Sequence, residues 1–234
     1  MVTVIVMSAQ APPSTTGTPL LPTGLRRPAA VATALCAALL VTLAVLVDHT
    51  AVPTSFDAWV QQSVAGHRVL RGRWPNLAVA AGEPITVIAV AVVAAAWCAR
   101  RRQWRLAVLA VSGPGLTGLA ETVLKPLVGR TIPTGELAFP SGHTAGATAM
   151  ALTLTFVVAG MVRQRRELVV GAGALVTVVV AGVVAVGLVA EHAHYPTDTI
   201  GGFCLAVVVT LTAAYAVDHV RRPVTQGVGR HTDD

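Results

Sequence analysis

Side chains that can bind or attack a phosphate are concentrated in two short stretches of this sequence. The first stretch spans residues 121–143, ETVLKPLVGRTIPTGELAFPSGH, and the second spans residues 191–198, EHAHYPTD. Their candidate functional side chains are Lys125, Arg130, Ser141, His143, His192, His194 and Asp198. Lysine and arginine donate charge-assisted hydrogen bonds to anions, and histidine can act as a nucleophile, a base or an acid. This combination of residue types predicts phosphoryl chemistry.

The spacing of these residues gives several of them distinct roles. Ser141 in PSGH is a favourable N-cap, and the free N–H groups after it would lie at the positive end of a helix dipole, which suits phosphate. Asp198, four residues after His194, can hold one imidazole nitrogen and leave the other as a nucleophile. His143 is then available to protonate the leaving group. Because no carboxylate cluster offers a metal cage, we expect a phosphohistidine route without metal or cofactor.

Each of these residues also has a purely structural interpretation. A single histidine in a loop is usually solvated or structural, and Ser-Gly at a helix start is usually only a cap. Arg130 can serve as an interfacial anchor that extends towards lipid headgroups. Glu121 lies four residues before Lys125, so the two side chains can pair on one face of a helix. We assign structural roles to Glu83 and Glu121, and we keep His192 as an additional candidate for contact with the substrate.

The composition identifies the kind of element that positions these residues. The chain has 234 residues, of which 54% are hydrophobic and 12% are charged, whereas a soluble domain has about 25% charged residues. The mean hydropathy of +0.68 excludes a disordered chain. The arginines form short clusters between apolar runs, so the pI of about 10.2 indicates membrane topology rather than nucleic-acid binding. The three cysteines have no short spacing and suggest neither a disulfide framework nor a zinc site.

Six apolar runs are each long enough to cross the hydrocarbon core, which requires about 20 helical residues. The runs are residues 28–47, 77–98, 106–124, 141–162, 168–190 and 199–217. We therefore predict an all-α fold, a six-transmembrane helical bundle over residues 28–218. Residues 1–27 are expected to be a disordered cytoplasmic tail and residues 219–234 a short cytoplasmic tail.

The basic residues predict the orientation of this bundle. With the N-terminus inside, twelve of the 17 lysines and arginines fall in cytoplasmic segments and five in outer segments. The positive-inside rule therefore predicts a multi-pass cell-membrane protein with both termini in the cytoplasm. Two crossings separate the two functional stretches, so both are expected on the extracytoplasmic side. The first outer loop carries Phe56, Trp59, Val60 and Val64 on one helical face, which predicts a short helix on the outer leaflet.

The two functional stretches resemble the type 2 phosphatidic acid phosphatase family, which shares its core with vanadium-dependent haloperoxidases. The family pattern has Lys, six residues and Arg-Pro; then Pro-Ser-Gly-His; and finally Ser-Arg, five residues, His, three residues and Asp. Here Lys125 and Pro133 match the ends of the first part, and residues 140–143 match the whole second part. His194 and Asp198 match the end of the third part.

The resemblance covers about residues 77–217 and implies a role for each matched residue. It implies that His194 is the nucleophile, that Asp198 is its partner and that His143 is the acid. It also implies that the phosphate is held by Lys125, Ser141 and Gly142.

Two positions depart from the family pattern. Ile132 stands where the first part has its arginine, and Gly187–Leu188 stand where the third part has Ser-Arg. Because a hydrogen bond to a charged group contributes about 1.5–3 kcal/mol, the loss of both arginines predicts a slow enzyme unless another residue substitutes. Arg130 and His192 are the candidates for that substitution.

Together these observations predict a membrane phosphatase that removes the terminal phosphate of a lipid phosphate or prenyl diphosphate at the extracytoplasmic face. A prenyl diphosphate, phosphatidic acid and phosphatidylglycerol phosphate fit this prediction equally. One alternative is a phosphotransferase that passes the phosphate from His194 to another lipid. Another is a non-catalytic protein that binds a lipid headgroup. The expected partners are the lipid substrate and membrane lipids, without nucleic acid.

Overall fold

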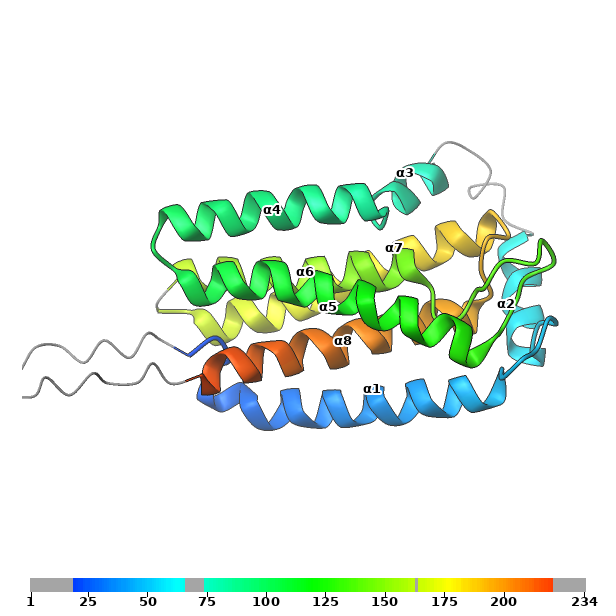
Figure 1. The fold of residues 1–234 in the computed structure, drawn as a ribbon, viewed down its shortest axis with the longest axis horizontal. Helices are drawn as coiled ribbons and strands as arrows, with labels where there is room; N and C mark the ends of the chain where they lie inside the picture. Colours follow the sequence, from blue (N-terminus) through cyan, green and yellow to red (C-terminus); the bar gives the residue numbers. More distant parts are fainter. Residues whose placement is uncertain (1–18, 66–73, 163, 221–234) are drawn as a thin grey trace, which may run out of the picture.

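Long helices make up most of the computed structural model, which describes residues 19–65, 74–162 and 164–220. The elements in chain order are the 3-10 helix η1 (Thr23–Leu25) and the α-helices α1 (Arg26–Leu46), α2 (Ser55–Ala65), α3 (Trp74–Ala80), α4 (Pro84–Arg100), α5 (Trp104–Val128), α6 (Gly142–Met161), α7 (Arg166–Ala190) and α8 (Pro196–His219). Figure 1 shows the long helices as a bundle. No element among the described residues is a strand, and the predicted all-α fold is confirmed.

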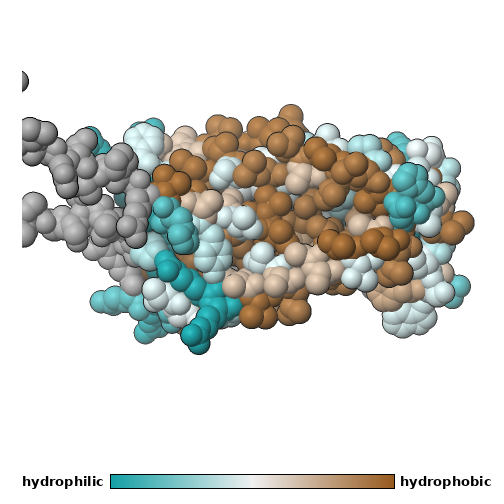
Figure 2. Space-filling view, turned by 60° about the horizontal axis from the view of Figure 1, so that its bottom comes forward, coloured by the Kyte–Doolittle hydropathy of each residue, from teal (hydrophilic) through white to brown (hydrophobic). Residues whose placement is uncertain are grey.

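Five helices of the described chain are long and apolar enough to cross a membrane, namely α1, α5, α6, α7 and α8. Helices α3 and α4 pass the same test together but are bent by 50° at the break between them. Pro84 is the first residue of α4, where the N–H that proline lacks is not needed. Counting this bent pair as one broken span gives the six predicted crossings. Hydrophobic side chains cover the middle of the bundle and hydrophilic ones lie towards its ends (Figure 2).

Helices α6 and α8 form the centre of the bundle. The buried share of their apolar windows is 61% and 56%, against 11% for α1 and 17% for α7. Both helices are rich in Gly, Ala and Thr, whose small side chains let helices approach closely in a membrane. A Cβ atom added to Gly202 in α8 would lie 2.3 Å from the carbonyl oxygen of Ser141. The segment that opens α6 is therefore packed directly against α8.

Both functional stretches lie at the same end of the bundle. In Figure 1 the α5–α6 connection, the α7–α8 connection and α2 occupy this end, while α1 begins and α8 ends at the opposite end. The backbone N–H of Ser141 donates a hydrogen bond to the carbonyl oxygen of Asp198 at 2.9 Å. This contact confirms that the two stretches converge at one face.

Part of the segment that was predicted to be a disordered tail is structured. We expected residues 1–27 to be disordered, but Leu20 and Leu21 are buried and their N–H groups donate to the Asp218 carboxylate at 2.7 and 3.1 Å. Arg105 also pairs with Asp218. One buried carboxylate therefore attaches the segment before α1 to the end of α8. Residues 1–18 and 221–234, which contain most of both predicted tails, lie outside the described residues.

The close packing of α8 on α6 predicts that Gly202→Ala destabilises the protein. An added methyl group in a packed interface typically costs about 1–3 kcal/mol, and the carbonyl oxygen of Ser141 belongs to the backbone and cannot rotate away. Gly182 in α7 provides a matched control, because a Cβ there would meet no atom within 4 Å. Thermal unfolding in detergent should show a lower unfolding temperature for Gly202→Ala than for Gly182→Ala. Equal unfolding temperatures would contradict the packing described above.

Candidate active site

The start of α6 presents the anion-binding end that the PSGH sequence predicts. Ser141 is the N-cap, with φ −70° and ψ 118°, and its Oγ accepts a hydrogen bond from the N–H of Thr144 at 3.4 Å. Gly142 and His143 are the first two helical residues, and N–H groups in a first turn have no acceptor within the helix. The predicted capping role of Ser141 is confirmed, and the positive end of α6 lies beside the α5–α6 connection.

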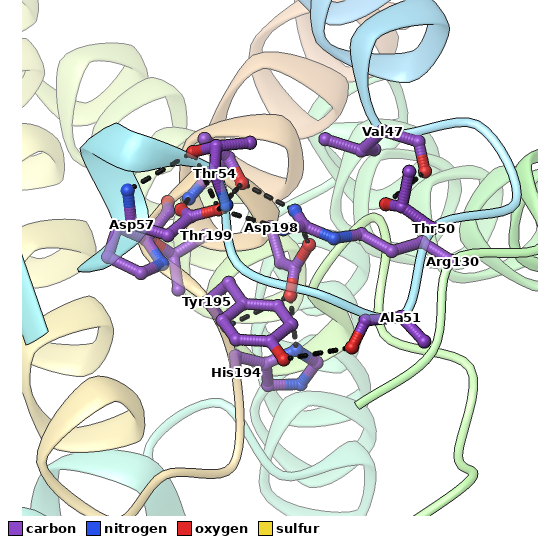
Figure 3. Close-up of polar contacts among 12 residues, drawn as sticks. Val47, Thr50, Ala51, Thr54, Asp57, Arg130, His194, Tyr195, Asp198 and Thr199 are labelled. Atoms are coloured by element: carbon purple, nitrogen blue, oxygen red, sulfur yellow. Dashed lines mark hydrogen bonds and ion pairs between the residues drawn. The ribbon is translucent and has the colours of Figure 1, made fainter. Parts of the chain in front are cut away.

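The start of α8 supplies the second part of the site. Tyr195 is the N-cap, Pro196 is the first helical residue, and Asp198 Oδ2 accepts a hydrogen bond from the N–H of Tyr195 at 2.9 Å. This capping contact holds the Asp198 carboxylate at the start of the helix. Figure 3 shows the carboxylate between Arg130 on one side and the ring of His194 on the other.

His194 and Asp198 are close together but are not hydrogen-bonded. The distance from His194 Nδ1 to Asp198 Oδ2 is 3.7 Å, whereas an N–H···O bond spans about 2.7–3.2 Å. Nδ1 is buried and has no hydrogen-bond partner among the described residues, while 11% of the side chain stays exposed. Catalytic hydrogen bonds are often long in unliganded enzymes and shorten when substrate binds. A small movement of the imidazole ring is therefore sufficient to form the predicted partnership.

Arg130 lies at the centre of a buried ion-pair network. One terminal nitrogen donates to Asp198 Oδ1 at 2.7 Å and the other donates to Asp57 Oδ2 at 2.8 Å. The guanidinium also donates to the hydroxyl of Thr197, and its Cζ lies 4.5 Å from the centroid of the Tyr195 ring. All three charged side chains have an exposed fraction of zero. The network joins α2, the α5–α6 connection and the start of α8 (Figure 3).

Asp57 is a member of this network that the sequence analysis did not identify. Its Oδ2 accepts a hydrogen bond from the N–H of Thr54 at 3.0 Å, and its own N–H donates to Thr54 Oγ1 at 3.1 Å. The N–H of Thr197 donates to Oδ1 at 2.8 Å. Thr54 and Asp57 thus form a capping box at the start of α2, and the T-x-x-D spacing is the sequence signal for it.

The contacts of Asp57 keep its carboxyl group ionised. Burial is the largest single influence and raises the pKa of Asp57, but hydrogen bonds from Arg130, Thr197 and Thr54 together hold that pKa below its usual value of 3.8. A carboxyl group with a lowered pKa stabilises the folded state fully above its unfolded pKa. This contribution is therefore complete above pH 3.8 and is lost as the pH falls through the lower folded value.

The network changes the role that we expected for Arg130. A phosphate-binding or headgroup-binding arginine must be reached by its ligand, but the Arg130 side chain is fully buried. Both terminal nitrogens donate to carboxylates, and Nε, which has no hydrogen-bond partner among the described residues, is buried as well. A substrate phosphate would have to break a buried ion pair to reach the guanidinium. Arg130 is therefore a positioning residue for Asp198 in this structure, and we do not retain it as a phosphate ligand or an interfacial anchor.

Lys125 is the cation that remains near the start of α6. Its Nζ lies 2.7 Å from Glu121 Oε1, which confirms the predicted pairing, and the two side chains are 27% and 18% exposed. The Glu121 carboxylate in turn lies against the first residue of α6, because a Cβ added to Gly142 would be 2.4 Å from Glu121 Oε1. The ion pair thus places Lys125 beside the helix end at which Ser141 and Gly142 were expected to hold phosphate.

His143 lies in the first turn of α6, directly after Gly142, which is packed against the Glu121 carboxylate, and two residues after Ser141, whose N–H donates to the carbonyl oxygen of Asp198 in α8. A Cβ added to Gly82 would lie 2.2 Å from the carbonyl oxygen of His143. The break between α3 and α4 therefore packs on the first turn of α6 and limits its movement.

His192 lies apart from these groups and has a structural explanation. Its side chain is exposed and its backbone has a φ of 57°, the left-handed conformation common where a helix ends. The N–H of His192 donates to the carbonyl oxygen of Val189 at 3.1 Å, and the N–H of Ala193 donates to that of Leu188 at 3.0 Å. These two bonds form a Schellman-type cap on α7. The cap on α7 thus accounts for the backbone conformation of His192, and no contact of its side chain with a substrate is needed to explain it.

The two positions at which the sequence analysis expects an arginine are occupied by buried apolar side chains. Ile132 is 7% exposed and packs with Ala138 and Tyr195. Leu188 is 1% exposed and packs in a cluster that includes Ala147. An unpaired arginine at either position would lose its hydration, at a cost that these apolar neighbours cannot offset. The apolar surroundings at both positions therefore favour Ile132 and Leu188 over arginine.

The site brings together groups suited to phosphate binding, nucleophilic attack and proton donation. The described residues include no group of three or more His, Cys, Asp or Glu side chains placed to hold a metal ion. The groups present are a half-buried ammonium, the N-terminus of α6, two imidazoles and a buried carboxylate that adjoins one of them.

Comparison with known proteins shows which family and which solved structure this chain resembles. Residues 122–222, which contain both functional stretches, match the family model of the PAP2 superfamily. The fold is similar to the crystal structure of a transmembrane PAP2-type phosphatidylglycerolphosphate phosphatase from Bacillus subtilis, with a TM-score of 0.67. The sequences are 20% identical, and the match covers 81% of this chain and 98% of the other. No curated protein matches the sequence significantly.

These matches confirm the resemblance inferred from the sequence motifs. Over residues 122–222 the chain is similar to the PAP2 superfamily, and its fold is similar to that of a transmembrane PAP2-type phosphatase.

The ion-pair network predicts that Arg130→Ala strongly destabilises the protein. Two carboxylates would be left buried without a counter-charge, and breaking a buried ion pair in this way costs about 3–5 kcal/mol. Arg130→Lys should restore only part of the stability, because one ammonium cannot replace a planar guanidinium that binds two carboxylates. Arg100→Ala, at an exposed arginine at the end of α4, is the control. Thermal unfolding in detergent measures the effect, and wild-type stability of Arg130→Ala would refute the structural role.

Proposed function

We propose that this protein is a lipid phosphate phosphatase that uses a phosphohistidine intermediate. The observation that carries the proposal is the convergence of Lys125, the start of α6 with His143 in its first turn, and His194 within the segment that matches the PAP2 superfamily. Each group supplies one requirement of phosphoryl transfer. The structural neighbour is named as a phosphatidylglycerolphosphate phosphatase, which supports a lipid phosphate as substrate.

In the proposed reaction, Nε2 of His194 attacks the phosphorus atom and forms a P–N bond as the P–O bond to the lipid breaks. His143 protonates the leaving lipid oxygen. Water then attacks the phosphohistidine, which releases orthophosphate and regenerates the imidazole. Lys125 and the N–H groups at Gly142 and His143 bind the phosphate oxygens and stabilise the charge that develops on them.

Asp198 orients His194 in this scheme, but the Asp198 carboxylate also accepts hydrogen bonds from other residues. Its carboxylate already accepts hydrogen bonds from Arg130 and from the N–H of Tyr195. His194 Nδ1, at 3.7 Å, must move closer to form a third bond. Because the carboxylate is divided among three donors, it stabilises the imidazolium less than an unshared partner would. We therefore propose a slow enzyme.

The outer surface of α5 supports a substrate with an apolar tail. Leu116, Leu119, Val123 and Leu127 are exposed and recur every three or four residues, so they form one apolar stripe. Lys125 is two residues from both Val123 and Leu127, so it lies on the opposite face of α5 from this stripe. A lipid whose acyl or prenyl chain follows the stripe would have to turn its headgroup around the end of α5 to reach the Lys125–Glu121 pair and the start of α6.

Non-catalytic lipid binding is the alternative favoured by the long His194–Asp198 distance and by the apolar side chains at Ile132 and Leu188. Phosphate release from phosphatidic acid, phosphatidylglycerol phosphate and prenyl diphosphate, measured with purified protein and a chelator, distinguishes the two functions. Release by wild-type protein would support the phosphatase. An inert wild-type protein that still binds these lipids would support the alternative, and loss of release on chelation would contradict the metal-independent route.

The mechanism predicts a specific order of defects. His194→Ala should abolish turnover because the nucleophile is lost, and His143→Ala should reduce kcat by about 100-fold or more because the leaving oxygen is no longer protonated. His192→Asn is the control, because His192 is exposed and asparagine tolerates its left-handed backbone. It should retain wild-type turnover. Initial rates of phosphate release measure all three, and wild-type turnover by His194→Ala would eliminate the phosphohistidine route.

The orientation part of the proposal places the site outside the cell and both termini in the cytoplasm. Thr134 in the α5–α6 connection and Gln164 between α6 and α7 are both exposed, at opposite ends of the bundle. An impermeant thiol reagent applied to intact cells should label Thr134→Cys and should not label Gln164→Cys. The unsubstituted chain, whose Cys98 and Cys204 are buried, controls for background. Labelling of only Gln164→Cys would reverse the orientation.

A further inference from the structure

The carboxylate of Glu121 lies against the first residue of α6, the helix end to which the proposed function assigns the substrate phosphate. A Cβ added to Gly142, the first residue of the helix, would lie 2.4 Å from Glu121 Oε1 and 2.7 Å from Oε2. Both carboxylate oxygens therefore lie next to the helix end whose first-turn N–H groups lack helical acceptors. A helix N-terminus attracts negative charge, whether the charge is on a phosphate or on a carboxylate.

Glu121 also engages the cation of the same site. Its Oε1 lies 2.7 Å from Lys125 Nζ, so the carboxylate contacts the helix end and the ammonium together. These are the two groups to which the proposed function assigns the substrate phosphate. The pair is 18% and 27% exposed, so solvent and a ligand can reach it. The Arg130 network, in contrast, has no exposed surface.

We propose that Glu121 is an internal competitor for the phosphate-binding position and that it sets the affinity of the site for phosphate. This inference rests on the proposed function. When a substrate phosphate enters, Lys125 exchanges the Glu121 carboxylate for the phosphate and the glutamate side chain turns away. After hydrolysis, Glu121 returns to the ammonium and the helix end and displaces orthophosphate. Glu121 thus favours product release at the expense of phosphate affinity.

A purely structural role for Glu121 makes the opposite prediction. If the carboxylate only held Lys125 in place, its removal would release the ammonium and weaken phosphate binding. If the carboxylate competes with phosphate, its removal vacates the position and strengthens binding. The sign of the change in phosphate affinity therefore separates the two roles.

The experiment measures the equilibrium binding of inorganic phosphate to purified protein in detergent by titration calorimetry. Glu121→Gln keeps the shape of the side chain and removes its charge, and it should lower the Kd for phosphate about tenfold, or about 1.4 kcal/mol. Glu136→Gln is the matched control, since Glu136 lies in the exposed α5–α6 connection at the same end of the bundle. It changes the net charge equally and should leave the Kd near the wild-type value. Glu121→Ala provides a second test that does not depend on the glutamine amide.

The outcomes separate this inference from the proposed catalysis. Tighter phosphate binding by Glu121→Gln and Glu121→Ala supports the inference even if no protein turns over lipid phosphate, in which case only the proposed catalysis fails. In an active enzyme the same variants should show stronger inhibition by orthophosphate. An unchanged or weaker affinity in both variants overturns the inference, as does equal tightening by Glu136→Gln. Absence of phosphate binding in wild type and all variants overturns both the inference and the phosphate site.

Discussion

A buried guanidinium held between two buried carboxylates is the interaction on which the rest of the site depends. Taking such charges out of water is costly unless good geometry and additional hydrogen bonds compensate for the lost hydration. Thr54, Thr197 and Tyr195 supply those additional bonds to Asp57 and Asp198. Because the donors belong to separate segments, the network is complete only when α2, the α5–α6 connection and α8 have one particular arrangement. The same arrangement brings the two functional stretches together.

Two ion pairs at this end of the bundle have different physical properties and therefore different uses. The Arg130 network is excluded from solvent, so it resists exchange and can fix positions. The Lys125–Glu121 pair is partly exposed, and ion pairs of that kind are weak enough to be replaced by a ligand. The buried network keeps the carboxylate beside His194 in place. In the proposed function, the partly exposed pair exchanges the Glu121 carboxylate for the substrate phosphate.

The overall architecture could be predicted from the sequence because a membrane leaves the backbone few alternatives. A span must satisfy its own hydrogen bonds, so long apolar runs become helices, and counting them places the functional stretches at one face. The role of Arg130 could not be predicted in this way. Its type indicates only that it binds an anion, and one of the two carboxylates that it contacts is Asp57, which lies 73 residues away in the sequence. The burial of Leu20 and Leu21 similarly depends on Asp218, at the other end of the chain.

The packing of α1 has a consequence for how the protein is assembled. The main partner of α1 within the described chain is α8, the last helix. Because α1 precedes α8 in the sequence, it is synthesised before its main partner and cannot dock on it until α8 has been made. The α1 hydropathy of 2.5, with only 11% of the span buried in the finished bundle, fits a helix that must be stable in lipid by itself. The packing of α1 on α8 and the placement of Asp198 beside His194 both require α8. A chain whose synthesis stops before α8 therefore lacks both contacts.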